Sequence, residues 1–334
     1  MWKKQKNLLV FPHHWQRPAR TEEWAYWECL ANLGYSQFVE IVCFPWASFI
    51  DAKRKGQVVK VEMFRTALLA APPKKTLVRA TVCQHIYAKD MLSWFKKLEI
   101  TDLYWSHALL NEGIIDGIRV YPFQLYPVQS IDKGGSPGTT KPIQDRKYLY
   151  SFIGAYEKNL YLTEVRNWIF RLPSRPDAII VRRSQWHYET EVYQEQVKGI
   201  KRSKADKRSA NNNEAEYINT LKDSVFSLCP SGSGPNSIRL WESLGLGCIP
   251  VILSDNLRLP GKESEWNQAV VFVKESPEAV KDIPQLLENL YQDKQKVLGM
   301  QKACRELWEK YGVNGPISIL NELTDTQVIR HRIE

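Results

Sequence analysis

Residues 223–261 read DSVFSLCPSGSGPNSIRLWESLGLGCIPVILSDNLRLPG, and this stretch decides the fold of the chain. Val225–Leu228 and Cys248–Leu253 are short apolar runs, as expected of strands that are buried on both faces. Residues 230–237 are almost all Ser, Gly, Pro and Asn, which predicts a loop. Apolar residues at helical spacing follow from Ile238 and end at glycines. The stretch therefore predicts strand, loop, helix and strand in an α/β sheet.

The predicted loop brings backbone N–H groups to the start of a helix, which favours an anion by geometry and by the helix dipole. Arg239 and Glu242 lie three residues apart on one helical face. An arginine can bind phosphate through two hydrogen bonds, and a carboxylate suits a pair of ribose hydroxyls. We therefore expect a pocket for a nucleoside diphosphate. The alternative is an ordinary Arg–Glu pair on a helix surface.

Two better-known phosphate loops do not fit this stretch. No Lys-Ser/Thr pair follows the glycines, and Gly232-Ser233-Gly234 lacks the third glycine of a dinucleotide-binding loop. The residues of this stretch expected to bind the nucleotide are Ser231, Gly232, Ser233, Gly234, Asn236, Ser237, Arg239 and Glu242.

The order and spacing of these segments resemble the signature of the exostosin-type glycosyltransferases. The likeness rests on FSLCP at 226–230, SIRLWESL at 237–244 and GCIPVILSD at 247–255. A weaker match lies upstream, in YLYSFIG at 148–154 followed by Arg166, so the resemblance covers about the last two thirds of the chain. It implies a GT-B fold and transfer of a sugar from a nucleotide sugar, with a UDP-sugar as donor. It also makes Arg166 a further donor-binding residue, as a second cation that can neutralise the diphosphate.

The length of the chain favours two domains. It has 334 residues, of which 43% are hydrophobic, and it alternates predicted strands and helices. We expect an α/β, GT-B-like protein with two Rossmann-like domains whose parallel sheets face each other across a cleft. The predicted parts are an acceptor-side domain at 1–129, a linker or mobile loop at 130–147, a nucleotide-sugar-binding domain at 148–315, and a C-terminal helix at 316–334 that packs back on the first domain.

The charge and the cysteines bear on partners and compartment. The formal net charge of +9 suits anionic partners, such as a nucleotide sugar, a lipid-linked saccharide acceptor or an anionic membrane; we expect no nucleic-acid partner. The apolar run Leu8–Phe11 is too short to span a membrane. The six cysteines form no C-x-x-C pair. We expect a cytoplasmic protein of bacterial type that can touch the inner face of the plasma membrane, although a trimmed chain would look the same.

The catalytic base is less sharply predicted. An inverting transfer needs a group that accepts the proton of the acceptor hydroxyl, and in a GT-B enzyme the first domain supplies it. Six residues lie near predicted strand ends, and we favour His14 and His107 among them. A retaining mechanism would need no such base. The chain contains no D-x-D, so we expect no metal and no other cofactor. The six candidates are His13, His14, His85, His107, Asp102 and Glu112.

Two functions stay open at this point. The favoured one is a glycosyltransferase, inverting and metal-independent, that builds a cell-surface polysaccharide on a glycan or lipid-linked saccharide. The alternative is a non-catalytic protein on a transferase scaffold that binds glycan or nucleic acid. The basic surface and the twelve tryptophans motivate the alternative. The sequence does not give the sugar, the linkage or the oligomeric state.

Overall fold

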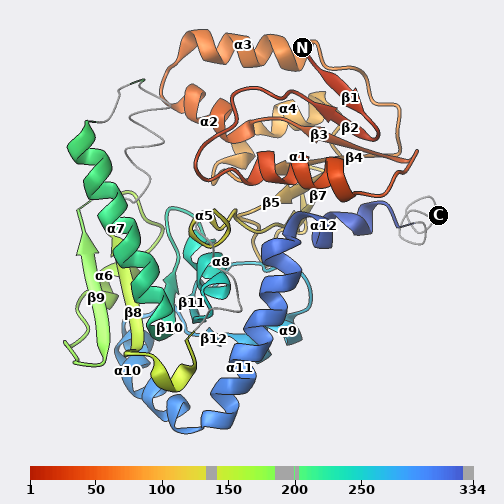
Figure 1. The fold of residues 1–334 in the computed structure, drawn as a ribbon. Helices are drawn as coiled ribbons and strands as arrows, with labels where there is room; N and C mark the ends of the chain where they lie inside the picture. The colour runs from red at the N-terminus through yellow and green to blue at the C-terminus, as the bar shows by residue number, and fades with distance from the viewer. Residues whose placement is uncertain (133–140, 185–198, 200–202, 326–334) are drawn as a thin grey trace. The chain divides into compact units, whose positions relative to one another are not determined.

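The computed structural model describes residues 1–132, 141–184, 199 and 203–325, and it divides into two compact units (Figure 1). The first unit comprises Met1–Tyr126, Arg258–Pro260 and Asn314–Glu334. The second comprises Pro127–Leu257 and Gly261–Val313. The described part of the expected linker falls within the second unit, and residues 133–140 lie outside the described residues.

The first unit is built on a seven-stranded sheet in the order β1-β2-β3-β4-β5-β7-β6. Strands β2 to β5 and β7 are parallel, as expected, while β1 and β6 are antiparallel edge strands. The strands are β1 Lys3–Gln5, β2 Leu8–Val10, β3 Val39–Cys43, β4 Val78–Cys83, β5 Asp102–Trp105, β6 Ile114–Ile115 and β7 Ile118–Pro122.

Five α-helices accompany this sheet in the described residues. One of them differs from what the sequence suggests: the basic residues and the glycine of 51–56 predict a turn, but Trp46–Arg54 is a helix. Its Trp46 and Phe49 are buried, and the indole of Trp46 donates to Thr81 Oγ1 at 2.8 Å. The helices are α1 Thr21–Asn32, α2 Trp46–Arg54, α3 Val58–Leu69, α4 Leu92–Lys97 and α12 Gly315–Leu320. The expected terminal helix at 316–334 thus ends early, and residues 326–334 lie outside the described part.

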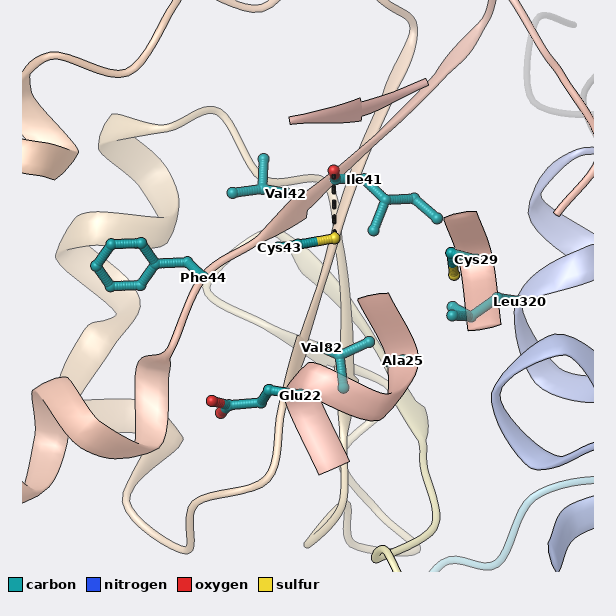
Figure 2. A pocket seen from close by; sticks show the side chains of 9 residues that line it. All are labelled: Glu22, Ala25, Cys29, Ile41, Val42, Cys43, Phe44, Val82 and Leu320. Atoms are coloured by element: carbon teal, nitrogen blue, oxygen red, sulfur yellow. Dashed lines mark hydrogen bonds between the residues drawn. The ribbon is translucent and has the colours of Figure 1, made fainter. Parts of the chain in front are cut away.

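A small cavity lies in the core of the first unit, and mainly apolar side chains line it (Figure 2). Helix α1 contributes Ala25 and Cys29, and α12 contributes Leu320. Glu22 is the one acidic side chain there, and its carboxyl group points away from Cys29 and Leu320 (Figure 2). The contact with Leu320 shows that α12 packs on α1 within this unit.

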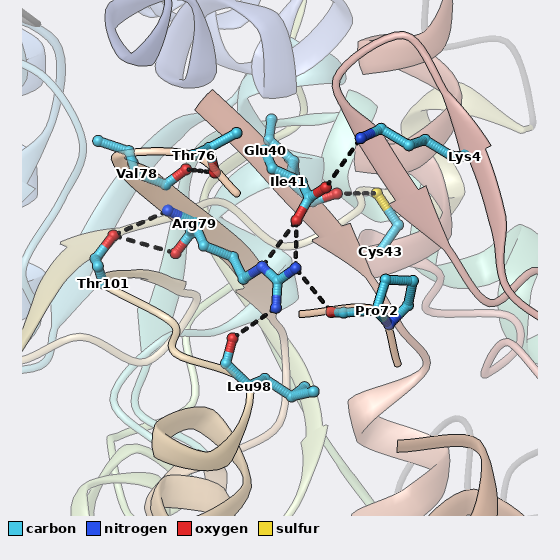
Figure 3. A network of polar contacts seen from close by, with 10 residues as sticks. All are labelled: Lys4, Glu40, Ile41, Cys43, Pro72, Thr76, Val78, Arg79, Leu98 and Thr101. Atoms are coloured by element: carbon cyan, nitrogen blue, oxygen red, sulfur yellow. Dashed lines mark hydrogen bonds and ion pairs between the residues drawn. The ribbon is translucent and has the colours of Figure 1, made fainter. Parts of the chain in front are cut away.

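A buried ion pair joins two neighbouring strands of the same sheet (Figure 3). Glu40 of β3 and Arg79 of β4 are paired residues in the ladder, and Arg79 Nε donates to Glu40 Oε2 at 2.8 Å. The rest of the guanidinium donates to the carbonyls of Leu98, at 2.9 Å, and Pro72, at 3.0 Å. Each nitrogen of the Arg79 guanidinium therefore has a hydrogen-bond acceptor, although the residue is only 1% exposed.

The second unit is built on a five-stranded sheet in which all strands are parallel, in the order β12-β11-β10-β8-β9. From β8 the chain passes through a helix to β9 on one side, and from β10 it passes through another helix to β11 on the other side. The strand order therefore reverses between β8 and β10. The strands are β8 Tyr148–Ala155, β9 Ala178–Arg183, β10 Ser224–Pro230, β11 Ile249–Leu253 and β12 Val271–Phe272.

The helices of the second unit differ in two places from those that the sequence suggests. Residues 160–172 have the pattern of one helix, but only α6, Val165–Ile169, forms there. The charged residues 194–213 suggest a mobile loop or an exposed helix, and from Lys204 they form one helix, α7, with the residues that follow. His187 follows a predicted strand and could line a cleft, but it lies outside the described part of the chain. The other helices are α5 Val128–Ile131, α7 Lys204–Lys222, α8 Ile238–Gly245, α9 Glu263–Ala269, α10 Pro277–Gln292 and α11 Lys294–Leu307.

None of the helices in the described residues combines the length and the apolar character that crossing a bilayer requires. Each unit is thus an α/β unit on a largely parallel sheet, as the fold expectation requires. How the two sheets face each other stays a prediction.

Candidate functional site

The reversal of strand order between β8 and β10 marks a natural binding place in the second unit. In open parallel sheets, ligands bind beyond the carboxyl ends of the strands where the order reverses, because the two following connections diverge there. The residues that follow β8 and β10 are 156–164 and 231–237. The second of these is the glycine-rich loop singled out in the sequence.

Two buried arginines meet at this point from different helices. Arg166, on α6, donates from Nε to the carbonyl of Ser231 at 2.9 Å and from Nη1 to the carbonyl of Ala155 at 3.2 Å. Arg239, on α8, donates from Nη2 to the carbonyl of Ile153. Arg166, on the helix that follows β8, therefore links the last residue of β8 to the residue after β10. Arg239, on the helix that follows β10, binds the backbone of β8.

The charges of these two arginines lack a counter-ion in the described part of the chain, since neither guanidinium has a carboxylate within ion-pair distance there. Arg166 and Arg239 are 8% and 7% exposed. Burial lowers the pKa of Arg166 to about 10, and the positive charge of Arg239 acts in the same direction. Arg239 Nε is buried with no hydrogen-bond partner among the described residues. Buried cations without a counter-charge are costly, so this arrangement favours a bound anion.

Aromatic rings offset part of that cost. Arg239 Cζ lies 4.7 Å from the centre of the Phe152 ring and 5.1 Å from that of Tyr217. Arg166 Cζ lies 4.5 Å from the centre of the Tyr161 ring. Such cation–π contacts stabilise a guanidinium group but supply no negative charge.

Two glycines leave room beside the guanidinium groups. A methyl group built on Gly154 would lie 3.4 Å from a terminal nitrogen of both Arg166 and Arg239, and one on Gly232 would lie 3.5 Å from Arg166 Nη2. Gly154 lies near the carboxyl end of β8, and Gly232 lies just after β10. The absent side chains allow the arginines to approach the backbone at the strand ends.

The glycine-rich loop is held in a defined shape. The N–H of Gly232 donates to the carbonyl of Gly234 at 2.9 Å, and the N–H of Leu162 donates to the carbonyl of Gly232, also at 2.9 Å. Ser237 occupies the N-cap position of α8, as expected, but its side chain makes no capping hydrogen bond. The Asn236 side chain accepts from the indole N–H of Trp241 at 2.9 Å, so it braces the start of the helix.

The hydroxyl of Ser231 has a partner that the sequence analysis missed. It donates to Glu275 Oε1, which also accepts from Thr163 Oγ1 at 3.0 Å. Glu275 Oε2 accepts from the N–H of Asp255 at 3.2 Å. Glu275 follows β12 and carried no motif, so only the sheet order brings it to this loop. Ser233 and Gly234 lie in the same loop as expected.

Glu242 lies one helical turn beyond Arg239 and is 2% exposed. Its Oε1 accepts from the N–H of Gln129 at 3.2 Å, and its Oε2 accepts from the hydroxyl of Tyr217 at 2.8 Å. Burial first, and then the Glu242 charge, raise the pKa of Tyr217 well above its ordinary value. Tyr217, on α7, therefore touches both Arg239 and Glu242. This contact could not be predicted, because α7 carries no recognisable motif.

The two favoured histidines lie in the first unit, after different strands. His107 follows β5 and is 6% exposed. Its burial is the main cause, and the nearby His85 the second, that lowers the pKa of His107 to about 3. His14 follows β2, is exposed, and packs edge-on to Phe64 at 5.9 Å. Partial burial, His13 and Lys60 lower the pKa of His14. Strands β3 and β4 separate β2 from β5 in the sheet, roughly 14 Å at the usual strand spacing, so the structure does not bring His14 and His107 together.

The remaining base candidates have structural partners. Asp102 begins β5 rather than ending it, and it receives two hydrogen bonds from Arg119, at 3.0 and 2.7 Å. Asp102 thus lies at a strand end, but at the amino end of β5. His85 Nε2 lies 3.3 Å from Asp51 Oδ1, and Glu112 accepts from Lys89 at 2.6 Å.

A buried carboxyl group at the carboxyl edge of the first sheet also escaped the sequence analysis. Glu22 accepts from the N–H of Ala47 and from that of Gln84, both at 3.1 Å. Burial raises its pKa to about 8 in spite of these two hydrogen bonds. Among the described residues, no group of three or more His, Cys, Asp or Glu side chains is placed to hold a metal ion.

The second unit is thus a Rossmann-like α/β unit with a candidate anion site at the point where its strand order reverses. The comparison with family models is more specific. The Exostosin GT47 domain model matches residues 112–290, just over half of the chain. The chain belongs to the exostosin GT47 family, which confirms the resemblance found in the sequence.

Curated relatives agree with this assignment. An exostosin-1 homolog of Caenorhabditis elegans is 30% identical over 170 residues, which cover 50% of this chain and 41% of the relative. Exostosin-1b of Danio rerio is 27% identical over 167 residues, covering 50% and 21%. Exostosin-1 of Drosophila melanogaster is 26% identical over 210 residues, covering 60% and 25%. The chain therefore matches less than half the length of these relatives.

Solved structures show a more distant likeness. A Staphylococcus aureus MnaA–UDP structure has 13% identity and a TM-score of 0.35, with coverage of 83% of this chain and 75% of that one. The pneumococcal O-GlcNAc transferase GtfA, in complex with UDP and GlcNAc, has 13% identity and a TM-score of 0.39, covering 93% and 60%. TM-scores of this size support no conclusion about function.

Proposed function

We propose that this chain is a glycosyltransferase that moves a sugar from a UDP-sugar to a glycan or a lipid-linked saccharide, in the synthesis of a cell-surface polysaccharide. One observation carries the proposal: two buried arginines, Arg166 and Arg239, converge without a carboxylate partner among the described residues at the strand-order reversal of the second unit. Membership of the exostosin GT47 family supports the type of reaction.

The donor pocket follows from this arrangement. The two guanidinium groups bind the diphosphate, and Arg239 Nε supplies a donor that is otherwise without a partner in the described residues. The backbone of the loop at 231–237 faces the same anion at the start of α8. Glu242 binds the ribose hydroxyls, because a carboxylate oxygen can accept more than one hydrogen bond.

The reaction needs two kinds of help. The acceptor oxygen forms a bond to the anomeric carbon while the bond from that carbon to the phosphate oxygen breaks, and its electron pair leaves with the diphosphate. Arg166 and Arg239 stabilise that leaving charge, so the proposed reaction is metal-independent. In an inverting transfer a base accepts the proton of the acceptor hydroxyl, and His14 and His107 stay our candidates for it.

Calorimetry with UDP on the full chain tests the donor pocket. We expect binding that Arg239→Met weakens by roughly 10- to 100-fold, because a hydrogen bond to a charged group contributes about 1.5–3 kcal/mol. Glu242→Ala should weaken it too, and EDTA should not. The matched control is Arg175→Met, a surface arginine of the same unit that pairs with Asp177 and Glu288 and should leave UDP binding unchanged.

Three results would overturn the proposal: no UDP binding by the parent chain, equal binding by Arg239→Met, or binding to duplex DNA that fades steeply with salt and ignores Glu242. The last result would favour the non-catalytic alternative. If UDP binds as expected, a screen for slow release of UDP from different UDP-sugars would identify the sugar donor.

A further inference from the structure

Two valines at the start of α3 are strongly exposed to solvent. Val58 is 71% and Val59 is 85% exposed, although they are the first two residues of a helix that buries Phe64 and Leu68 in the core of the first unit. Single exposed apolar residues are ordinary on protein surfaces. An adjacent pair at the start of a helix forms a small exposed apolar patch, which suits contact with a partner.

The same tip is strongly basic. Residues 53–60 read KRKGQVVK, with four cationic side chains and no acidic one. Asp51, just before them, is only 5% exposed. Arg54 is engaged: it lies 3.5 Å from Asp90 and stacks on Tyr87. Lys55 and Lys60 also have contacts of their own. The exposed Lys53 forms no ion pair within the described part of the chain.

The tip is also a well-defined turn. Gly56 has a φ of +67°, a backbone conformation that favours glycine, and the N–H of Gln57 donates to the carbonyl of Ala52 at 2.9 Å. The N–H of Gly56 donates to the carbonyl of Lys53 at 3.2 Å. This is the pattern that ends a helix with a left-handed glycine, so the valines are held outward by hydrogen-bonded backbone between α2 and α3.

Exposed valines among lysines fit one partner better than others. The phosphates of a nucleic acid would attract the lysines, but the exposed valines would make no favourable contact with it. A bilayer surface can bind both, because lipid phosphates attract Lys and the headgroup–acyl boundary accepts apolar side chains. We propose that residues 53–60 dock this protein on a membrane that carries anionic lipid, with Val58 and Val59 entering the headgroup–acyl boundary. The inference does not depend on the donor pocket.

Vesicle flotation with the full chain tests the proposal. We expect binding to phosphatidylcholine vesicles that contain phosphatidylglycerol, weaker binding to phosphatidylcholine alone, and loss of binding at high salt. Val58→Ser/Val59→Ser and Lys53→Gln/Lys55→Gln should each lower the partition coefficient by about tenfold or more, since each lysine near an anionic surface contributes several-fold. The matched control, Leu298→Ser/Lys302→Gln on α11, also changes exposed apolar and basic residues and should bind like the parent chain.

All these positions are exposed, so the variants should keep the parent's thermal unfolding, and a shared loss of stability would be visible there. The proposal is overturned if the parent chain ignores anionic vesicles, if the valine variant binds as well as the parent, or if the control loses as much binding. Binding to duplex DNA that the lysine substitutions remove and the valine substitutions leave intact would assign the tip to nucleic acid instead.

Discussion

Arg166 and Arg239 come from two different helices, yet a terminal nitrogen of each would lie 3.4 Å from a methyl group placed on Gly154. The two cations thus share the space above one glycine at the carboxyl end of β8. Repulsion between them and their burial both act against this arrangement. A diphosphate would remove the repulsion, so the geometry links the fold of the second unit to its proposed ligand.

Gly154→Ala should weaken UDP binding by about tenfold, because the added methyl group would crowd both guanidinium groups and lie 3.0 Å from the Phe152 ring. Calorimetry measures the effect. Gly299→Ala is the matched control: it lies in α11 of the same unit with nothing within 4 Å of the added carbon, so UDP binding should be unchanged. Equal affinities in Gly154→Ala and the parent would show that the two arginines do not hold the diphosphate.

Tyr217→Phe should weaken UDP binding by about five- to tenfold and leave the binding of inorganic pyrophosphate unchanged. The substitution removes the 2.8 Å hydrogen bond to Glu242, the proposed ribose ligand, but keeps the ring beside Arg239. Calorimetry with the two ligands separates the ribose contribution from that of the diphosphate.

Tyr150→Phe provides the control for that substitution. The Tyr150 hydroxyl is buried with no partner in the described residues, so its removal should leave both affinities unchanged and keep or slightly raise stability. If Tyr217→Phe weakens UDP and pyrophosphate equally, Tyr217 acts on the diphosphate and not through Glu242.

The sequence was sufficient to locate the glycine-rich loop between β10 and α8, because every local signal there agrees. Each segment there predicts a single kind of element: the apolar runs of β10 and β11 predict strands, the glycine-rich segment a loop, and the amphipathic α8 a helix. Together they predict strand, loop, helix and strand in order. The same reasoning failed at Trp46–Arg54, where the basic residues suggested a turn. The deciding factor there is burial of Trp46 and Phe49, which depends on tertiary packing.

The contacts within the site were less accessible to sequence reasoning. Arg166 was found only through the family resemblance, and Tyr217 and Glu275 were not found at all. Their positions depend on the strand order of the second sheet, which brings residues that are far apart in the chain together near the ends of β8, β10 and β12. No local pattern encodes that order, so no motif marks these residues.

Glu40→Gln should lower the free energy of unfolding of the first unit by about 3 kcal/mol, because it leaves the buried Arg79 cation without its counter-charge. Urea unfolding followed by tryptophan fluorescence measures this. The double variant Glu40→Leu/Arg79→Met removes both charges and should regain part of the loss. If the single substitution had no effect, the Arg79 contacts to the Leu98 and Pro72 carbonyls would be sufficient on their own.

The Glu22 carboxyl group should make the first unit less stable as the pH rises from 6.5 to 8. Its pKa in the folded protein is about 8, against an ordinary value of 4.5, so the folded state holds a proton that the unfolded state has lost in this range. His107, whose pKa falls to about 3, and His14, whose pKa is also lowered, act mainly below pH 6.5 and in the opposite direction. Glu22 therefore dominates the interval from 6.5 to 8, with an expected loss of about 2 kcal/mol.

Glu22→Gln should remove this dependence, because an amide resembles the protonated carboxyl group and can still accept the N–H of Ala47. Urea unfolding at both pH values, for the parent and the variant, gives the comparison. Glu62→Gln, an exposed residue of α3, is the control and should keep the parent's pH dependence. A parent chain whose stability is constant or rises between pH 6.5 and 8 would mean that Glu22 is ionised in the folded protein, held by its two backbone N–H donors.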